Sequence, residues 1–234
     1  MLATAWDDCS PHMETYWRGY IASAEYSWNP TKRTLDQYDV AYLNREYGIV
    51  IEDYESLYQK LRAGADFFEQ AFHVEGSRAH TDNALFNLPG IRHWTRPEKQ
   101  VKKDQEYFRN LLIELPNLDK PGAWSEKYKD RLNKASNVLN DYMETSVKLD
   151  SLYHNSLRNR YHWEVFMATN TFQVTAPKLL LALKSCDTSE QESLQKGISE
   201  IDNAIQDFSL AWENLKKVYG KTRFISYPDN YVPD

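Results

Sequence analysis

The sequence has little glycine, proline or cysteine. Its 234 residues include 8 glycines, 9 prolines and 2 cysteines. So few turn-forming residues argue against an all-β sandwich, which needs a turn roughly every 8–12 residues. Cys9 and Cys186 lie far apart in the chain, and two cysteines support neither a disulfide framework nor a cysteine-ligated zinc site. We therefore expect no disulfide scaffold, no metal and no other cofactor.

Long apolar runs and an excess of positive charge are also lacking. The longest apolar stretch, around residues 179–183, is far shorter than the roughly 20 residues that a membrane-spanning helix needs. The first ten residues have neither the basic region nor the apolar core of a secretory signal. The 28 basic and 34 acidic residues give a net charge of -6, whereas phosphate binding needs clustered lysine and arginine. We expect neither a membrane nor a nucleic-acid partner.

Aromatic residues are abundant. Tyrosine (16), phenylalanine (9) and tryptophan (7) make up 14% of the chain, which has a mean hydropathy of -0.71. Tyrosine and tryptophan join an apolar body to a polar tip, so they suit both protein cores and sugar-stacking surfaces. Two interpretations follow: the rings fill the core, or some of them form faces that bind carbohydrate.

Apolar residues recur at helical spacing through most of the chain. The expected helices cover residues 10–28, 34–47, 49–72, 97–114, 124–149, 152–185 and 188–219. Thr34 and Thr188 are the expected N-caps of two of them, Gly48 and Gly220 end two, and Pro177 should kink or split its helix. Short connections make sequential helices antiparallel neighbours, so the sequence predicts an all-α antiparallel bundle of about six or seven helices.

The last of these helices carries the clearest apolar stripe. Its members recur every three or four residues: Leu194, Ile198, Ile201, Ile205, Phe208, Trp212 and Leu215.

Motifs of known chemistry are absent. The chain has no glycine-rich phosphate loop, no G-x-S-x-G and no H-E-x-x-H. Two H-x-E pairs occur, at His73 with Glu75 and at His162 with Glu164, but residues two apart do not share a helix face. We interpret them as polar residues rather than metal ligands. Motifs identify no catalytic residue.

The first thirty residues differ from the rest. A short apolar strand at residues 2–5 ends in Trp6, Asp7 and Asp8, and a helix follows. In a βα-barrel the functional residues sit at the carboxyl ends of strands. A tryptophan face stacks on a sugar ring and a carboxylate accepts hydrogen bonds from its hydroxyls, so this end of the strand is typical of carbohydrate recognition.

This segment resembles the last strand and helix of the catalytic barrel of family 20 glycoside hydrolases, the β-N-acetylhexosaminidases. That family carries Trp-Gly-Glu on the strand and Ala-Glu-x-x-Trp on the helix. The corresponding residues here are Trp6-Asp7-Asp8 and Ala24-Glu25-Tyr26-Ser27-Trp28. The resemblance implies that Trp6 lines the sugar pocket and that Asp8 binds hydroxyls of the terminal sugar. It makes residues 1–30 a remnant of the last βα unit and residues 31–234 a helical C-terminal domain.

The family's catalytic pair is an adjacent Asp-Glu on an earlier strand, and no Asp-Glu dipeptide occurs in this chain. We therefore expect no hydrolysis by the chain alone. The resemblance implies a parent barrel that binds an N-acetylhexosamine-containing glycan, and an exported or periplasmic protein. An exposed barrel-facing surface on Trp17 and Tyr20 would favour association, including a homo-oligomer.

Two other hypotheses remain. The chain could be an aromatic-rich binding module for glycans or a protein partner, with residues 86–94 and 224–231 as candidate faces. It could also be a complete helical enzyme whose carboxylate or histidine cluster is assembled between helices, which a sequence does not reveal.

Overall fold

The computed structural model describes residues 13–30, 33–51, 53–73 and 112–221, to which the following account refers. These residues are mostly helical and contain no named strand, only one isolated antiparallel bridge between His73 and Leu112. The all-α class expected from the sequence is confirmed. The strand expected at residues 2–5 lies outside the described residues.

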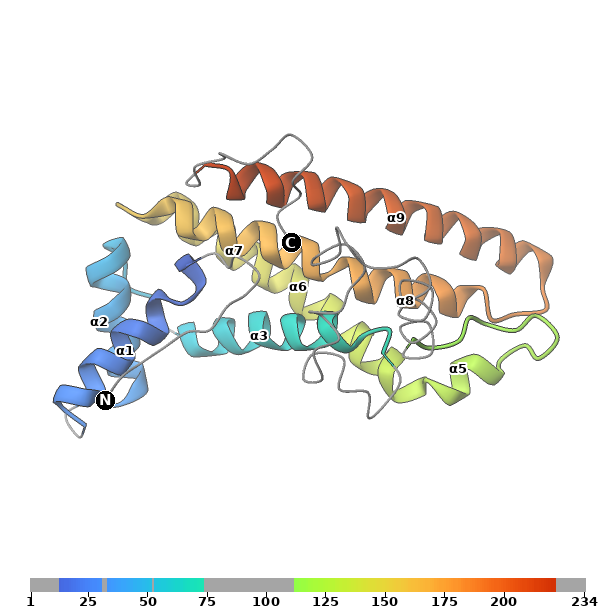
Figure 1. Cartoon of the computed structure of the whole chain (residues 1–234), viewed down its shortest axis with the longest axis horizontal. Helices are drawn as coiled ribbons and strands as arrows, with labels where there is room; N and C mark the ends of the chain where they lie inside the picture. The colour runs from blue at the N-terminus through green and yellow to red at the C-terminus, as the bar shows by residue number, and fades with distance from the viewer. Residues whose placement is uncertain (1–12, 31–32, 52, 74–111, 222–234) are drawn as a thin grey trace, which may run out of the picture.

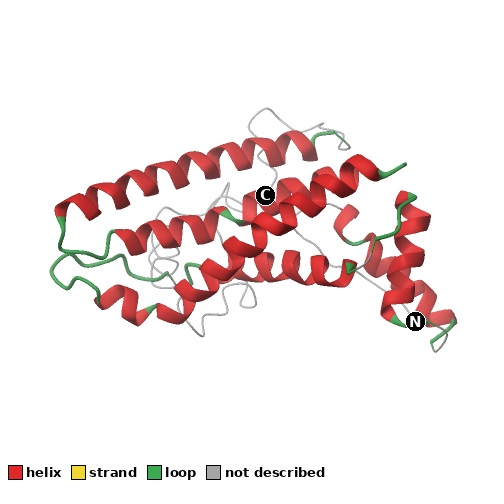
Figure 2. Ribbon diagram, turned by 180° about the vertical axis from the view of Figure 1, so that it is seen from behind, coloured by secondary structure: helices red, strands yellow, loops and turns green. Residues whose placement is uncertain are grey.

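The two longest helices are α6 and α9, and several of the other helices pack along them. Their bounds are η1 (Met13–Thr15), α1 (Trp17–Trp28), α2 (Leu35–Tyr47), α3 (Tyr54–Gln70), α5 (Ala123–Lys127), α6 (Lys129–Asn155), α7 (Arg160–Gln173), α8 (Thr175–Ser185) and α9 (Gln191–Tyr219). Helices α7 and α8 lie between α6 and α9, and α3 packs on α6 (Figure 1). Helices α1 and α2 stand at one end and α5 at the other, as the view from behind also shows (Figure 2).

The ends of α2 agree with the sequence. Thr34 and Gln37 form a reciprocal capping box, and Gly48 ends the helix with a left-handed φ of 72°. The next helix was expected from residue 49 but begins at Tyr54. Its N-cap, Asp53, also adopts a left-handed conformation (φ 61°), so the chain turns there before the helix starts.

The predicted helix over 152–185 is wrong, because residues 156–159 interrupt it. This link packs on the C-terminus of α2 and donates hydrogen bonds to its last carbonyls. The amide of Leu157 donates to Tyr47 (2.9 Å), and the side-chain amide of Asn159 donates to the carbonyl of Glu46 (2.7 Å). The guanidinium of Arg158 donates to two further carbonyls of the same turn. A distant helix end therefore decides where α6 stops.

Pro177 lies in the first turn of α8, and the division between α7 and α8 falls at Val174. A proline in the first turn costs no helical hydrogen bond, since that N–H has no partner inside the helix. The expected split is therefore present, three residues before the proline.

Helix α9 begins later than predicted. Its N-cap is Glu190, and Thr188 instead accepts a hydrogen bond from the amide of Glu190 (3.1 Å) in the preceding turn. Gly220 ends the helix as expected. Of the helix predicted at 97–114, only residues 112–114 are described, and they are not helical.

The largest core cluster is built from aromatic rings. It joins α2, α3, α6 and α7, and its most buried large members include Tyr38, Tyr42, Tyr47, Tyr54 and Trp163. Each is at most 4% exposed. For these rings the interpretation as core residues is correct.

Candidate functional site

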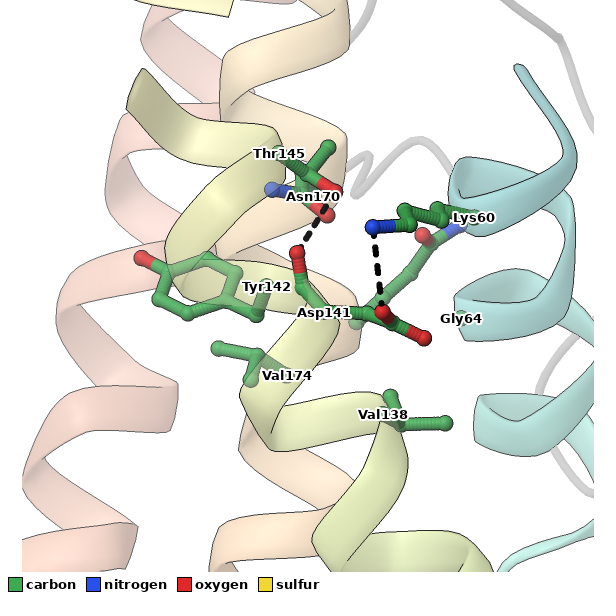
Figure 3. A pocket seen from close by; sticks show the side chains of 9 residues that line it. Lys60, Gly64, Val138, Asp141, Tyr142, Thr145, Asn170 and Val174 are labelled. Atoms are coloured by element: carbon green, nitrogen blue, oxygen red, sulfur yellow. Dashed lines mark hydrogen bonds and ion pairs between the residues drawn. The ribbon is translucent and has the colours of Figure 1, made fainter. Parts of the chain in front are cut away.

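A small polar pocket lies where α3, α6 and the end of α7 meet (Figure 3). It is lined by Lys60, Gly64, Val138, Asp141, Tyr142, Thr145, Asn170, Gln173 and Val174. Its volume of about 10 Å³ is close to the minimum that holds one water molecule. No substrate-sized group fits inside it.

The mouth of the pocket carries alternating charges. The ammonium of Lys60 lies 3.4 Å from the carboxylate of Asp141 and forms an ion pair with Glu144. Lys148 approaches the same Glu144 carboxylate at 2.9 Å. The hydrogen bond from Lys60, followed by that from Lys148, lowers the pKa of the Glu144 carboxyl to about 2. The bond to Glu144 in turn raises the pKa of Lys60.

The inner wall is neutral and hydrogen-bonded. The buried Thr145 hydroxyl donates to the carbonyl of Asp141 (2.6 Å), and the buried Asn170 amide donates to the Ser146 hydroxyl (3.3 Å). Gly64 leaves the wall open here: a β-carbon at that position would lie 3.5 Å from the Gln173 side-chain oxygen.

This arrangement fits a structural water better than catalysis. Glycoside hydrolysis needs a carboxyl group that stays protonated as the general acid, which requires a raised pKa. Glu144 has the opposite shift, and the lysine beside it is held as a cation. The sequence could not reveal this pocket, because its lining comes from helices distant in the chain.

A wider groove runs between α6, α8 and α9. Its volume is about 280 Å³, slightly below the size of most small-molecule sites. Its apolar floor includes Leu139, Leu181 and Ala204, and its rim holds Lys178 paired with Asp207 at 2.5 Å. The ion pair joins two of the groove's charged side chains, and Glu200 and Asn203 also line the groove.

A chain of hydrogen bonds links the aromatic core to a histidine. The hydroxyl of Tyr42 lies 3.3 Å from that of Tyr47, which lies 3.1 Å from Nδ1 of His162. Burial raises the pKa of Tyr42 to about 12 and lowers the pKa of His162. The Tyr47 hydroxyl lies between those two groups, so the three side chains tie the aromatic core to α7.

The residues expected to bind sugar, Trp6 and Asp8, lie outside the described residues, and their role stays a prediction. In the matching helix, Glu25 forms an ion pair with Arg33 at 2.9 Å and Trp28 is 91% exposed. Neither side chain belongs to the core clusters of the described residues.

The described residues contain no group of histidine, cysteine and carboxylate side chains that could hold a metal ion. Of the H-x-E residues, His162 contacts Tyr47 and Glu164 forms an ion pair with Lys221. None of the described helices is both long and apolar enough to cross a membrane. Comparison with family models, curated proteins and solved structures finds no match for the chain.

Proposed function

We propose that this chain is the C-terminal helical part of a glycoside hydrolase that resembles the β-N-acetylhexosaminidases, and that this part binds rather than catalyses. In this proposal residues 1–30 complete a parent barrel, and residues 31–234 form an antiparallel bundle behind it. The motifs at residues 6–8 and 24–28 support the resemblance. The missing Asp-Glu pair and the chemistry of the polar pocket support a non-catalytic role.

The observation that carries the proposal is the exposure of α1. No residue of this helix is buried. Trp17 is 44% and Trp28 is 91% exposed, and the ring of Tyr20 lies beside that of Trp17, with centroids 6.3 Å apart. These residues share one helix face by their spacing. In a βα unit the helix buries its apolar face against the sheet, so this face fits a barrel, of which the described residues contain no strand.

Helix α1 is also tied to the helical domain, through Arg18. Arg18 donates to both carboxylate oxygens of Asp39 at 2.8 Å and forms an ion pair with Glu55. Its guanidinium also lies over the ring of Tyr58, 4.5 Å from the centroid. Asp39 is only 3% exposed, and a bidentate pair of this kind fixes geometry as well as charge. Helix α1 is thus held to the domain by Arg18 and by Ile21 and Tyr26, which pack on the core, while Trp17 and Trp28 stay exposed.

The first test measures the size of the native protein and the activity of the chain. An antibody raised against the chain should detect a protein much larger than 27.5 kDa, and the chain alone should not release a chromophore from an aryl N-acetylhexosaminide. A native band at 27.5 kDa, or hydrolysis by the purified chain, would contradict the proposal.

The second test uses the larger protein. We expect Trp6→Ala and Asp8→Ala to raise KM, and Trp17→Ala and Trp28→Ala to lower thermal stability by loosening the contact between barrel and helices. Val147→Ala is the matched control, because Val147 is 72% exposed on α6. Unchanged KM and unchanged stability in all four variants would remove the assignment.

A further inference from the structure

Helix α9 carries an apolar seam that the described fold covers only in part. The seam residues alternate spacings of four and three along the helix: Leu194, Ile198, Ile201, Ile205, Phe208, Trp212, Leu215 and Tyr219. This is the heptad pattern of a helix that packs lengthwise on another helix. It continues for about three and a half heptads, which is in the range that sustains a coiled coil.

Helix α9 packs most closely on α7 and α8 through a row of small residues beside the seam, and Phe208, Trp212 and Leu215 of the seam also contact α7. The buried residues of α9 are Gly197, Ala204, Ala211 and Val218, one heptad apart. No seam residue is buried, and Ile198, Ile205 and Phe208 are 50%, 53% and 43% exposed. The helix therefore contacts its own domain most closely through its smallest side chains and leaves many of its largest apolar ones partly exposed to water, the reverse of the usual arrangement.

Two aromatic residues of the seam pack on a ring of the neighbouring helix α7. The ring of Phe172 on α7 lies 5.3 Å from Phe208 and 5.7 Å from Trp212, centroid to centroid, and also contacts Phe68 on α3. Because these rings pack against one another, Phe208 and Trp212 are held in place before any partner arrives. A pre-organised apolar surface loses less entropy on binding.

We infer that this seam binds the same seam of a second copy of the chain, with the two α9 helices antiparallel. The charges at the helix ends favour this occupant. The start of α9 is acidic, with Glu190 as N-cap and Glu192 in the first turn, and its last turn is basic, with Lys216 and Lys217. Antiparallel pairing sets each basic end beside the partner's acidic end and also opposes the helix dipoles favourably.

The same alignment places the exposed apolar residues opposite one another. When Lys216 lies beside Glu190 of the second copy, Ile198 faces Phe208 of that copy and Ile201 faces its Ile205. The paired stretch from Leu194 to Trp212 is about 27 Å long at 1.5 Å per residue. A two-fold axis relates the two seams, as an isologous dimer requires.

The test is sedimentation velocity over a range of protein concentrations. The wild-type chain should shift from 27.5 kDa toward twice that mass as concentration rises. Ile205→Glu should raise the dissociation constant about a hundredfold or more, because it places two carboxylates near the two-fold axis. Leu210→Glu is the matched control: Leu210 is 70% exposed on the same helix but off the seam, so its dimer should persist. Unchanged melting temperatures would show that both variants fold.

A charge exchange tests the antiparallel orientation. Lys216→Glu with Lys217→Glu should weaken the dimer about tenfold, since symmetry doubles the effect of each charge. Adding Glu190→Lys and Glu192→Lys to the same chain should restore it.

A chain that stays monomeric at all concentrations overturns the inference, as does a dimer unaffected by Ile205→Glu. A dimer that is lost in Trp28→Ala and kept in Ile205→Glu also overturns it, and would assign the association to α1. The proposed function is independent of these outcomes, because it rests on α1 and on the size of the native protein.

Discussion

The indole nitrogen of Trp163 donates a hydrogen bond to the hydroxyl of Ser156 at 2.7 Å, and both residues are at most 1% exposed. The Ser156 hydroxyl in turn donates to the carbonyl of Leu152 at 2.7 Å. Trp163 belongs to the aromatic core, while Ser156 ends α6. This bond therefore ties the largest core side chain to the point where α6 stops and the link to α7 begins.

Ser156→Ala should destabilise the fold. It leaves the buried indole N–H without an acceptor, which costs about 1–3 kcal/mol. Urea unfolding followed by tryptophan fluorescence measures the loss. Ser209→Ala is the control, since the exposed Ser209 hydroxyl bonds only to a carbonyl of its own helix; its change should stay within about 0.5 kcal/mol. Equal effects of the two variants would contradict this role of Ser156.

Gly197→Ala should also destabilise the fold, although alanine favours helices. A β-carbon at residue 197 would lie 2.7 Å from Sγ of Cys186 and 2.9 Å from its backbone nitrogen. Overpacking of this kind costs about 1–3 kcal/mol, against a helix-propensity gain of about 1 kcal/mol. Gly19→Ala is the matched control, because no atom lies within 4 Å of a β-carbon there. Thermal unfolding should show that Gly19→Ala stabilises and Gly197→Ala destabilises; the same sign for both would refute the close approach of α8 and α9.

Asp187→Asn should loosen α5. One carboxylate oxygen of Asp187 accepts a hydrogen bond from the amide of Gly122 (3.0 Å) and the other from that of Ser125 (2.7 Å). Asparagine keeps one acceptor and turns a donor toward the second amide, so we expect a loss of about 1–3 kcal/mol. Hydrogen exchange should become faster at one or both of these amides while the middle of α9 keeps its protection. Unchanged exchange at both amides would show that the carboxylate does not cap α5.

Glu144→Gln should change the acid limb of the stability curve. Lys60 and Lys148 lower the pKa of Glu144 from 4.5 to about 2. A carboxyl whose pKa is lower in the folded state stabilises the fold above its unfolded pKa, and this contribution is lost as pH falls through the folded pKa. The melting temperatures of wild type and Glu144→Gln should therefore differ most above about pH 4.5 and converge toward pH 2.

Asp119→Asn serves as the control for that titration, because Asp119 is exposed in the segment before α5. Its melting temperature should follow that of the wild type across the same pH range. A constant difference between wild type and Glu144→Gln down to pH 2 would mean that the ion pairs do not form in solution.

Local signals in the sequence were reliable where a few neighbouring residues decide the structure. Thr34 with Gln37 and Gly48 fixed both ends of α2, because capping depends on residues within one turn. Thr188 resembled an N-cap but lies two residues too early, since the chain first turns toward α9 through Glu190. The sequence did not reveal the polar pocket, because Lys60, Asp141 and Asn170 come together only when three helices pack.

By itself the sequence determined that this protein is helical, that its helices are amphipathic and where several of them are capped, since periodicity and capping are local properties of the chain. Only the tertiary structure decided which face of each helix is covered. Helix α9 buries Gly197 and Ala204 while its seam residues Ile198 and Ile205 stay exposed, and α1 keeps Trp28 in water while Arg18 binds Asp39. Coverage depends on the neighbours available in space, and residue spacing along one helix contains no information about them.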